Sequence, residues 1–462
     1  MLISKRWLIV VAAFVLSLSP AANAQSQLPK NIIVLFADGA AATQFEFGRY
    51  SSRALRNAGF AVTDTVLHQG TIGFLTTHPN EAFATDSAAT ASAMSTGVKT
   101  TIGAIAMTPD GKPARNAAEV AKAHGKRIGL VTTAEVYDAS PAAFAAHAKS
   151  RRDSSAIVDQ YLALEPDVLL GGGSDYFSPA GAEGGKRKDK VDVIAAFRAK
   201  GYAVARTAAE LRSAAGPRLL GLFAEQAMDS EIDRAGTTQP SFAEMTQAAL
   251  KALSVSPQGF FLFAENEGID TTAHRNDAAA LMRDLWAFDE AVRVALDFQR
   301  RSPDTLVIVT GDHETGGLSI TYALKDLSDT SSRNRFYADS THLKLLSGIT
   351  ISFDKALEML GDKPTGDGLD KLLATHFPGF RLDADLREAI IKRQVLERSH
   401  SDAVRNALGR MVARQTGIYW GTSGHTTEPV IVGAIGPGAE RFKGYHDNTA
   451  FGQILHTLLG QP

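Results

Sequence analysis

Five short stretches of the chain are apolar at nearly every position. Unbroken apolar runs of this length are typical of strands buried on both faces of a parallel sheet. Segments with apolar residues every three or four positions lie between them, as expected of helices, and the clearest covers 277–300. This alternation predicts a doubly wound α/β sheet. The five apolar stretches are 31–37, 128–133, 260–264, 306–310 and 430–435.

The segment 322–420 interrupts this alternation. Within it, Ala403, Ala407 and Met411 recur at every fourth position, which is a helical spacing. We therefore expect a helical insertion packed at one end of the sheet, in a position where it could cap a site.

The segment 85–97 consists almost entirely of serine, threonine and alanine. Asp86 and Ser87 are typical of a helix start, and Gly97 is typical of a helix end. A hydroxyl at a helix N-terminus lies among unpaired N–H groups at the positive end of the helix dipole, where an attached phosphate is stabilised. This segment alone leaves two interpretations open, a reactive Ser87 or a capping serine on a buried alanine-rich helix.

Acidic residues and a histidine follow three of the predicted strands. Asp38 follows the stretch 31–37, and Glu265 follows 260–264. Asp312 and His313 come shortly after the stretch 306–310. Because ligands of open α/β sheets bind beyond the carboxyl ends of the strands, we expect these four side chains to meet at one edge of the sheet.

Further side chains have the character of metal ligands. Asp270 and His274 stand four residues apart, so a helix would turn both to one side, although such a pair alone is more often found at the surface. His425 precedes the last predicted strand and could complete a ligand set. The chain has no cysteine, so a metal site has to use carboxylates, imidazoles and hydroxyls, which suit zinc.

These residue types fit the chemistry of phosphate esters. Two divalent ions can hold the attacking and leaving oxygens of an in-line displacement at phosphorus. A serine hydroxyl next to such an ion becomes an effective nucleophile. An arginine can bind the remaining phosphate oxygens through two parallel hydrogen bonds.

The N-terminus has the pattern of a signal peptide. Lys5 and Arg6 precede an apolar run over 7–18, and Ala22-Asn23-Ala24 fits a cleavage site. The run is short for a membrane span, so we expect cleavage after Ala24, no membrane anchor afterwards, and a periplasmic or secreted protein. A retained anchor is the alternative. The net charge of −2 gives no basic surface for nucleic acid.

Several of these motifs together resemble the alkaline phosphatase family. They occur in one order along most of the chain, and 322–420 is the part that matches least. The resemblance implies a three-layer α/β sandwich over 25–462, in which a large, mostly parallel sheet is flanked by helices. The matching segments are 86–89, 95–100, 138–143, 167–173, 265–274, 312–313 and 425–437.

The resemblance also implies roles for individual residues. Ser87 would be the nucleophile that becomes phosphorylated, and Arg151 would bind the phosphate, with Asp138 beside the substrate. From the sequence alone, Arg152 competes with Arg151 for this role. Two zinc ions and one magnesium ion are implied, and Thr271, where some members carry lysine or histidine, leaves the identity of the third metal open. The implied ligands are Asp270, His274 and His425 for the first zinc, Asp38, Asp312, His313 and Ser87 for the second, and Asp38, Ser140 and Glu265 for magnesium.

The implied activity is the hydrolysis of small phosphate monoesters to inorganic phosphate and an alcohol, through a phosphoserine. No nucleic-acid partner is required, and a homodimer is an open option because members of the family are often dimers. Two alternatives remain. One is a phosphodiesterase or sulfate-ester hydrolase of the same superfamily, and the other is a non-catalytic phosphate- or metal-binding protein of the cell envelope. The motif Asp86-Ser87-Ala88-Ala89 favours the monoesterase.

Overall fold

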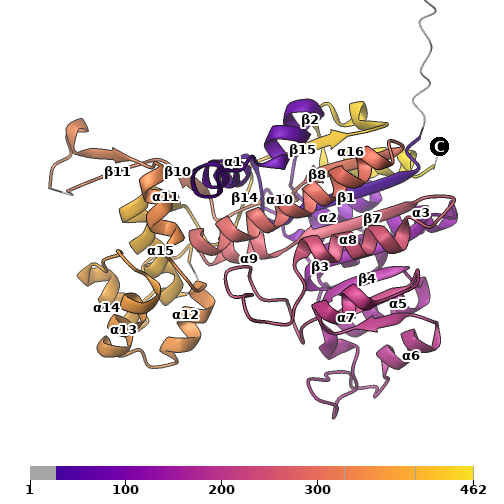
Figure 1. Ribbon diagram of the computed structural model, residues 1–462, viewed down its shortest axis with the longest axis horizontal. Helices are drawn as coiled ribbons and strands as arrows, with labels where there is room; N and C mark the ends of the chain where they lie inside the picture. The colour runs from indigo at the N-terminus through magenta and orange to yellow at the C-terminus, as the bar shows by residue number, and fades with distance from the viewer. Residues whose placement is uncertain (1–27, 327, 401, 461–462) are drawn as a thin grey trace, which may run out of the picture.

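A ten-stranded sheet forms the centre of the protein. The computed structural model describes residues 28–460 except 327 and 401, so the predicted signal peptide, 1–24, lies outside the described residues. All five predicted strands are present in the sheet, which confirms the α/β fold (Figure 1). In spatial order the strands are β16 (Gly444–His446), β2 (Thr71–Leu75), β15 (Val430–Ile435), β8 (Thr305–Thr310), β1 (Asn31–Ala37), β7 (Phe260–Asn266), β3 (Arg127–Glu135), β4 (Val168–Gly172), β6 (Leu219–Leu222) and β5 (Ala203–Ala205).

One predicted strand differs in direction from the prediction. The apolar run 430–435 forms β15, which pairs antiparallel with both β8 and β2, whereas the other neighbours in the sheet pair parallel. The expectation of a parallel strand was therefore wrong here. An unbroken apolar run indicates burial on both faces, and a strand inside a mixed sheet is buried in this way whichever direction it runs.

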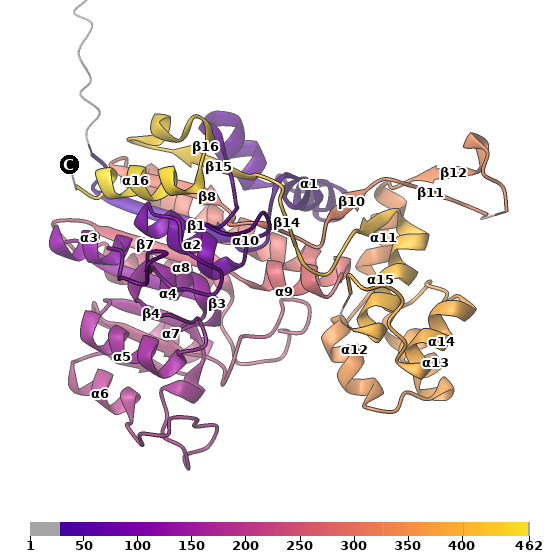
Figure 2. The same cartoon turned by 180° about the vertical axis from the view of Figure 1, so that it is seen from behind.

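Helices cover both faces of the sheet, so the protein has three layers (Figures 1 and 2). Alternate residues of β1 supply the two faces, because Ile33 and Leu35 belong to one apolar cluster and Ile32 and Val34 to the other. The first face carries α1 (Ala42–Ser51), α7 (Ala208–Ser213), α8 (Phe242–Leu253) and α10 (Ala278–Arg301). The second carries α2 (Ser87–Thr96), α3 (Ala117–Ala123), α4 (Ala139–Ala145), α5 (Ser154–Leu164), α6 (Val193–Ala199) and α16 (Asn448–Leu458).

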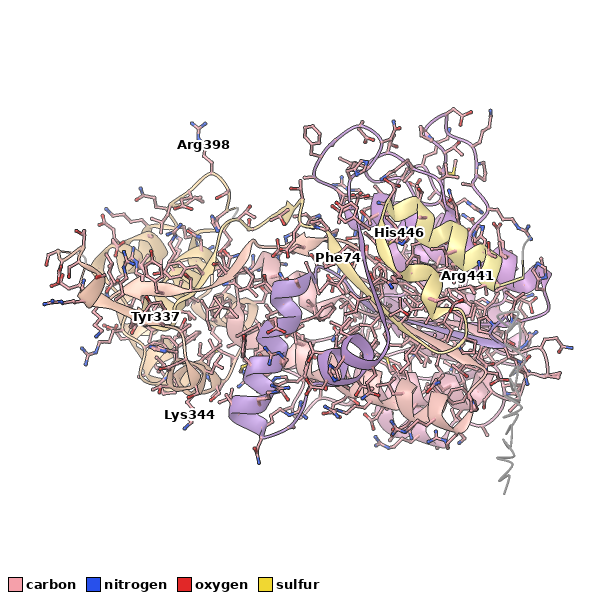
Figure 3. All side chains as sticks on the ribbon, turned by 90° about the horizontal axis from the view of Figure 1, so that it is seen from above. Phe74, Tyr337, Lys344, Arg398, Arg441 and His446 are labelled. Carbon is pink, nitrogen blue, oxygen red and sulfur yellow. The ribbon has the colours of Figure 1, made fainter. Side chains whose placement is uncertain are left out.

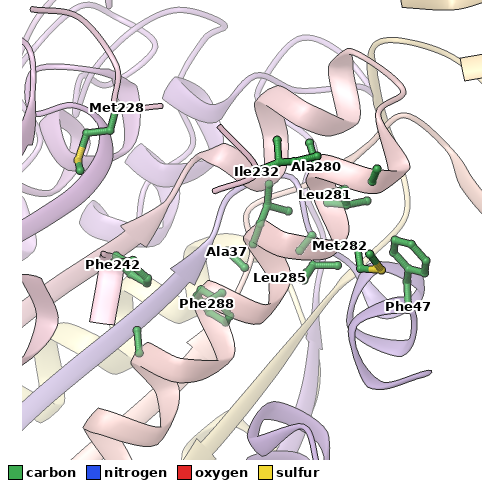
Figure 4. Close-up of a cluster of buried hydrophobic side chains, with 14 of the residues drawn as sticks. Ala37, Phe47, Met228, Ile232, Phe242, Ala280, Leu281, Met282, Leu285 and Phe288 are labelled. Atoms are coloured by element: carbon green, nitrogen blue, oxygen red, sulfur yellow. The ribbon is translucent and has the colours of Figure 1, made fainter. Parts of the chain in front are cut away.

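The core beneath α10 shows how the helical spacing seen in the sequence is used. Leu281, Leu285 and Phe288 point from one side of this helix into a buried cluster with Ala37 and Phe242 (Figure 4). The rings of Phe242 and Phe288 stack with their centroids 6.2 Å apart. The helix lies across the sheet and fixes the strands whose carboxyl ends carry the polar residues. No helix among the described residues has the length and apolar character of a membrane span.

The segment 322–420 is mostly helical and lies at one end of the molecule, beyond α9 (Gly268–His274) (Figures 1 and 2). Seen from above, Tyr337 and Lys344 mark this end, and Arg441 and His446 lie towards the other (Figure 3). Its elements are β11 (Tyr322–Leu324), β12 (Arg335–Tyr337), α11 (Ser340–Ser347), α12 (Phe353–Leu360), α13 (Gly366–His376), α14 (Ala384–Lys392), α15 (Ala403–Thr416) and β13 (Ile418–Trp420).

Small two-stranded pairings join this segment to the sheet. Strand β13 pairs with β10 (Leu318–Ile320), and β14 (His425–Thr426) pairs with β9 (Glu314–Thr315). In the second pairing His425 lies opposite Thr315, and its ring stacks on that of His313 with the centroids 3.6 Å apart. The remaining short helical segments are Ser52–Arg56, Val62–Leu67, Ser174–Tyr176, Ser332–Asn334 and Ala439–Phe442.

A buried acid inside α10 gives a prediction for stability against pH. The carboxylate of Asp284 accepts hydrogen bonds from the Glu231 N–H at 3.0 Å and the Ser230 hydroxyl at 2.9 Å, and burial raises its pKa to about 7. The folded protein thus holds this proton more tightly than the unfolded chain. The resulting stabilisation is complete below the unfolded pKa and is lost as the pH rises through about 7.

We expect Asp284→Asn, which cannot ionise, to gain stability relative to the wild type as the pH rises from about 4 to above 7. The upper limit of this relative gain is about 4 kcal/mol. Urea unfolding of both proteins at a series of pH values measures it, and the difference cancels the titration of every other group. The exposed Asp297→Asn on the same helix is the matched control. A constant difference across this range would contradict the prediction.

Candidate active site

Helix α2 carries Ser87 as its first residue. The Asp86 carboxylate accepts the Ala89 N–H at 3.0 Å as the N-cap, and Gly97 ends the helix with a φ of +75°. All ten helix residues are buried, and their small side chains allow close packing against α4 and α16. The Ser87 Oγ lies 3.2 Å from Nε2 of His313, so the predicted helix places its hydroxyl beside a predicted ligand.

Strands β1 and β8 bring Asp38, Asp312 and His313 together, as predicted from their positions after the strands. The His313 Nε2 lies 3.7 Å from an Asp38 oxygen and 3.1 Å from an Asp312 oxygen. All three side chains are almost completely buried. These residues form one of the two groups in the described chain whose ligand atoms lie within 4.8 Å of one another.

Helix α9 and strand β14 supply the neighbouring group. Nε2 of His274 lies 3.0 Å from an Asp270 oxygen and 3.0 Å from Nε2 of His425. The second group within 4.8 Å contains Asp270, His313 and His425. The sequence placed His274 with Asp270 and His425, and the structure brings all three together but adds His313 at their side.

The other ring nitrogens of two histidines contact backbone carbonyls. Nδ1 of His274 lies 2.5 Å from the Ser423 carbonyl oxygen, and Nδ1 of His425 lies 2.8 Å from that of Thr85. When Nδ1 donates to these carbonyls, the lone pair of Nε2 is free to bind a metal. The contacts of Ser423 and Thr85 could not be predicted from the sequence, because a backbone carbonyl leaves no signature in the residue type.

Two carboxylate oxygens at this edge have no hydrogen-bond partner. They are Oδ1 of Asp38 and Oδ2 of Asp312, and both are buried. Burial, together with the neighbouring acids, raises the pKa of Asp38 well above its usual range, and burial raises the pKa of Asp312 to about 7. Burial lowers the pKa of His313 well below its usual range, which keeps the ring neutral. Unpaired acids beside a neutral imidazole are the donors expected at a divalent cation.

A third set of oxygen donors adjoins Asp38. The hydroxyl of Ser140, in the first turn of α4, donates to Asp38 at 3.3 Å. Glu265, at the end of β7, accepts from the Thr132 hydroxyl at 2.5 Å, and burial raises its pKa to about 8. The Ser140 hydroxyl also contacts Glu265, so Asp38, Ser140 and Glu265 lie together. All three offer oxygen donors, which suit magnesium.

The structure separates the two candidate arginines. Arg151 donates to Asp138 at 3.0 Å and to Asp86 at 3.4 Å, so its guanidinium lies beside the start of α2. The side chain of Arg152 is exposed and makes no hydrogen bond or ion pair with the described residues. Of the two arginines, Arg151 is the one that contacts Asp86, the residue before Ser87.

Both arginines line a pocket of about 590 Å³ that opens beside this start of α2. Four of the lining residues, Glu135, Tyr137, Ser154 and Tyr176, carry no signal in the sequence. Two of them are tyrosines, and aromatic residues at strand ends give no signal that distinguishes them from core residues. The lining residues are Asp86, Glu135, Tyr137, Asp138, Arg151, Arg152, Ser154 and Tyr176.

Comparisons with known proteins agree over nearly the whole chain. A family model described as alkaline phosphatase matches residues 29–461. Alkaline phosphatase 3 of Bacillus subtilis (strain 168) is 33% identical over 444 residues, which cover 93% of this chain and 89% of the relative. Streptomycin-6-phosphate phosphatase of Streptomyces griseus is 34% identical over 65% of this chain and 78% of its own.

Solved structures give the same result. The crystal structure of Thermus thermophilus alkaline phosphatase superposes with a TM-score of 0.84 at 32% identity and covers 96% of both chains. A cold-active alkaline phosphatase from a psychrophilic Shewanella species gives a TM-score of 0.76 at 32% identity, over 93% of this chain and 99% of its own.

Proposed function

Since the chain belongs to the alkaline phosphatase family, we propose that it hydrolyses phosphate monoesters to inorganic phosphate and an alcohol through a phosphoserine at Ser87. One observation carries the proposal. The Ser87 hydroxyl lies at the N-terminus of α2 and 3.2 Å from His313, at the centre of the converging carboxylates and imidazoles. A capping serine on an ordinary buried helix would have no such surroundings.

The residues present fit the implied metals, because buried oxygens of Asp38 and Asp312 lack any hydrogen-bond partner. When bound, the divalent ions would supply positive charge that lowers the pKa of the serine hydroxyl and offsets the charge of the phosphate. We propose Asp270, His274 and His425 for a first zinc, Asp38, Asp312, His313 and Ser87 for a second, and Asp38, Ser140 and Glu265 for magnesium.

The chain's own residues then act in order. Arg151 and the N–H groups at the start of α2 hold the phosphate oxygens. The Ser87 Oγ attacks phosphorus, the bond to the alcohol oxygen breaks, and the alcohol leaves with a proton. Water then attacks the same phosphorus from the opposite side, which frees Ser87 and releases inorganic phosphate. Asp138 and Asp86 fix the Arg151 guanidinium throughout.

We propose further that the protein is exported after cleavage at Ala24, that the mature domain covers 25–462, and that it forms a homodimer. The signal-peptide pattern over 1–24 supports export. The similarity to a bacterial alkaline phosphatase supports the assignment of the domain. The helices of 322–420 lie next to α9, which supports a role for this segment in shaping the site entrance.

The test is the turnover of an aryl phosphate monoester against the matching diester, with and without a chelator. We expect faster cleavage of the monoester and loss of activity with the chelator. Faster cleavage of the diester would move the assignment to the phosphodiesterase alternative. A tightly bound phosphate without turnover of either ester would favour a binding protein.

Replacing Arg151 by alanine tests the phosphate-binding role. We expect kcat/KM for an aryl phosphate to fall about 10²-fold, because a charge-assisted, two-point contact to the phosphate is lost. Inhibition by inorganic phosphate should weaken in parallel, which steady-state kinetics with added phosphate measures.

The matched control for this prediction is Arg301→Ala, at the end of α10 and at the opposite edge of the sheet. It should retain wild-type kinetics. An Arg151→Ala variant that is inhibited by phosphate as strongly as the wild type would contradict the role.

A further inference from the structure

The pocket beside Arg151 has a wall that the phosphate chemistry does not use. Tyr137 and Tyr176 pack edge to face there, with ring centroids 5.1 Å apart. The Tyr137 hydroxyl donates to Asp175 at 2.5 Å, and Lys186 pairs with the same carboxylate at 2.9 Å, so the wall is firmly held. The pocket has a volume of about 590 Å³, which is within the range of small-molecule sites.

The charged groups of this pocket divide into paired and unpaired ones. Asp86 and Asp138 are both paired with Arg151. Glu135 and Arg152 line the same cavity, yet neither has an ion pair within 4.0 Å in the described part of the chain. Glu135 and Arg152 therefore line the same pocket with opposite charges and form no ion pair with each other.

Solvation by water explains why Arg152 has no ion-pair partner among the described residues, but it does not explain Glu135. An exposed arginine such as Arg152 is well solvated and needs no partner. Glu135 is different, because it is only partly exposed and burial raises its pKa. Asp138 and Asp175 raise this pKa further, and its carboxylate accepts a hydrogen bond from the Ala227 N–H but has no ion-pair partner in the part of the chain that the structure describes. Lys186 is a cation close enough to interact with Glu135, but its ammonium is already paired with Asp175 at 2.9 Å. A partly buried carboxylate in this setting favours a positively charged ligand.

We propose that this pocket is a subsite for a leaving group that carries both an ammonium and a carboxylate, as in the phosphate ester of a hydroxy-amino acid. Glu135 receives the ammonium against the tyrosine wall, and Arg152 receives the carboxylate at the mouth. The phosphate is held by Arg151, on the side of the pocket nearest Ser87. The inference rests on the proposed phosphomonoesterase activity and adds its substrate class.

Four substrates separate the two charges. O-phosphoserine carries both groups, phosphoethanolamine only the ammonium, phosphoglycerate only the carboxylate, and glycerol phosphate neither. We expect the wild type to have its highest kcat/KM on O-phosphoserine and its lowest on glycerol phosphate. Glu135→Gln should lower kcat/KM about 10-fold for the two ammonium substrates. Arg152→Gln should lower it about 3-fold for the two carboxylate substrates, less because the guanidinium is exposed.

Matched controls are Glu183→Gln and Arg301→Gln, which remove exposed charges outside the pocket. They should leave the substrate order unchanged. A wild type without preference among the four esters would overturn the proposal. Equal losses on all four substrates in either pocket variant would also overturn it, because the residue would then only support the fold. If the wild type hydrolysed none of the four esters and no aryl phosphate either, the proposed function itself would be overturned.

Discussion

Replacing Ser87 by alanine is expected to lower kcat/KM for an aryl phosphate by about 10³-fold or more. The variant loses the hydroxyl at the N-terminus of α2 that lies 3.2 Å from His313, so no phosphoenzyme can form at position 87. The fold should persist, because the Asp86 cap is unchanged. The metal content should persist as well, because Asp38, Asp312 and His313 remain as proposed ligands of the second zinc. Acid quenching with radiolabelled substrate measures the phosphoenzyme directly.

The matched control is Ser95→Ala, two turns further along the same helix. Its Oγ accepts the Ala117 N–H at 3.1 Å, so its loss affects packing rather than the reaction. We expect this variant to lose some stability and to form the phosphoenzyme normally. Acid-stable phosphate in the Ser87→Ala protein, or near-normal turnover by it, would refute the assignment of the nucleophile.

Metal removal should have the second largest effect. We expect a chelator to reduce turnover by at least about 10²-fold and to lower the melting temperature. The physical reason is the buried acid cluster. Burial raises the pKa of Asp38, Asp312 and Glu265, and nearby carboxylates add to each of these increases. A cation present at about 1,000 times its Kd contributes roughly 4 kcal/mol to the folded state.

To test this expectation, zinc and then magnesium are added back to the chelated protein. Activity, thermal unfolding and metal content are measured at each step. His425→Ala should bind one zinc fewer than the wild type. His456→Ala, whose ring contacts the Ser95 carbonyl on α2, is the matched control and should bind the full number. Unchanged melting temperature and turnover after complete chelation would rule out the metal site.

Much of the site was predictable because it depends on where buried strands end. Asp38, Glu265 and Asp312 each follow an apolar run, and the parallel strands of a sheet deliver their carboxyl ends to one edge. The helix at Ser87 was predictable for a different reason, since Asp86 and Gly97 are strong start and stop signals. Neither prediction required knowledge of which strands are neighbours.

The remaining features depend on tertiary contacts that leave no local pattern. Strand β15 runs antiparallel to β8, and its apolar residues would be the same in either direction. Arg151 and Arg152 are identical neighbours in the sequence, and only the loop after α4 decides which one faces Asp86. The pocket wall of Tyr137 and Tyr176 joins two separate strand ends, which pattern analysis treats independently.

Ser423, whose carbonyl contacts His274, also links the site to the helical segment 322–420. The Ser423 N–H and hydroxyl both donate to the Ser399 carbonyl, at 2.9 Å each. Deleting 322–420 to obtain a smaller enzyme would therefore remove Ser399, which holds Ser423 in place next to the His274 imidazole of the proposed site. Any minimal version has to retain the loop around Ser399 or replace it.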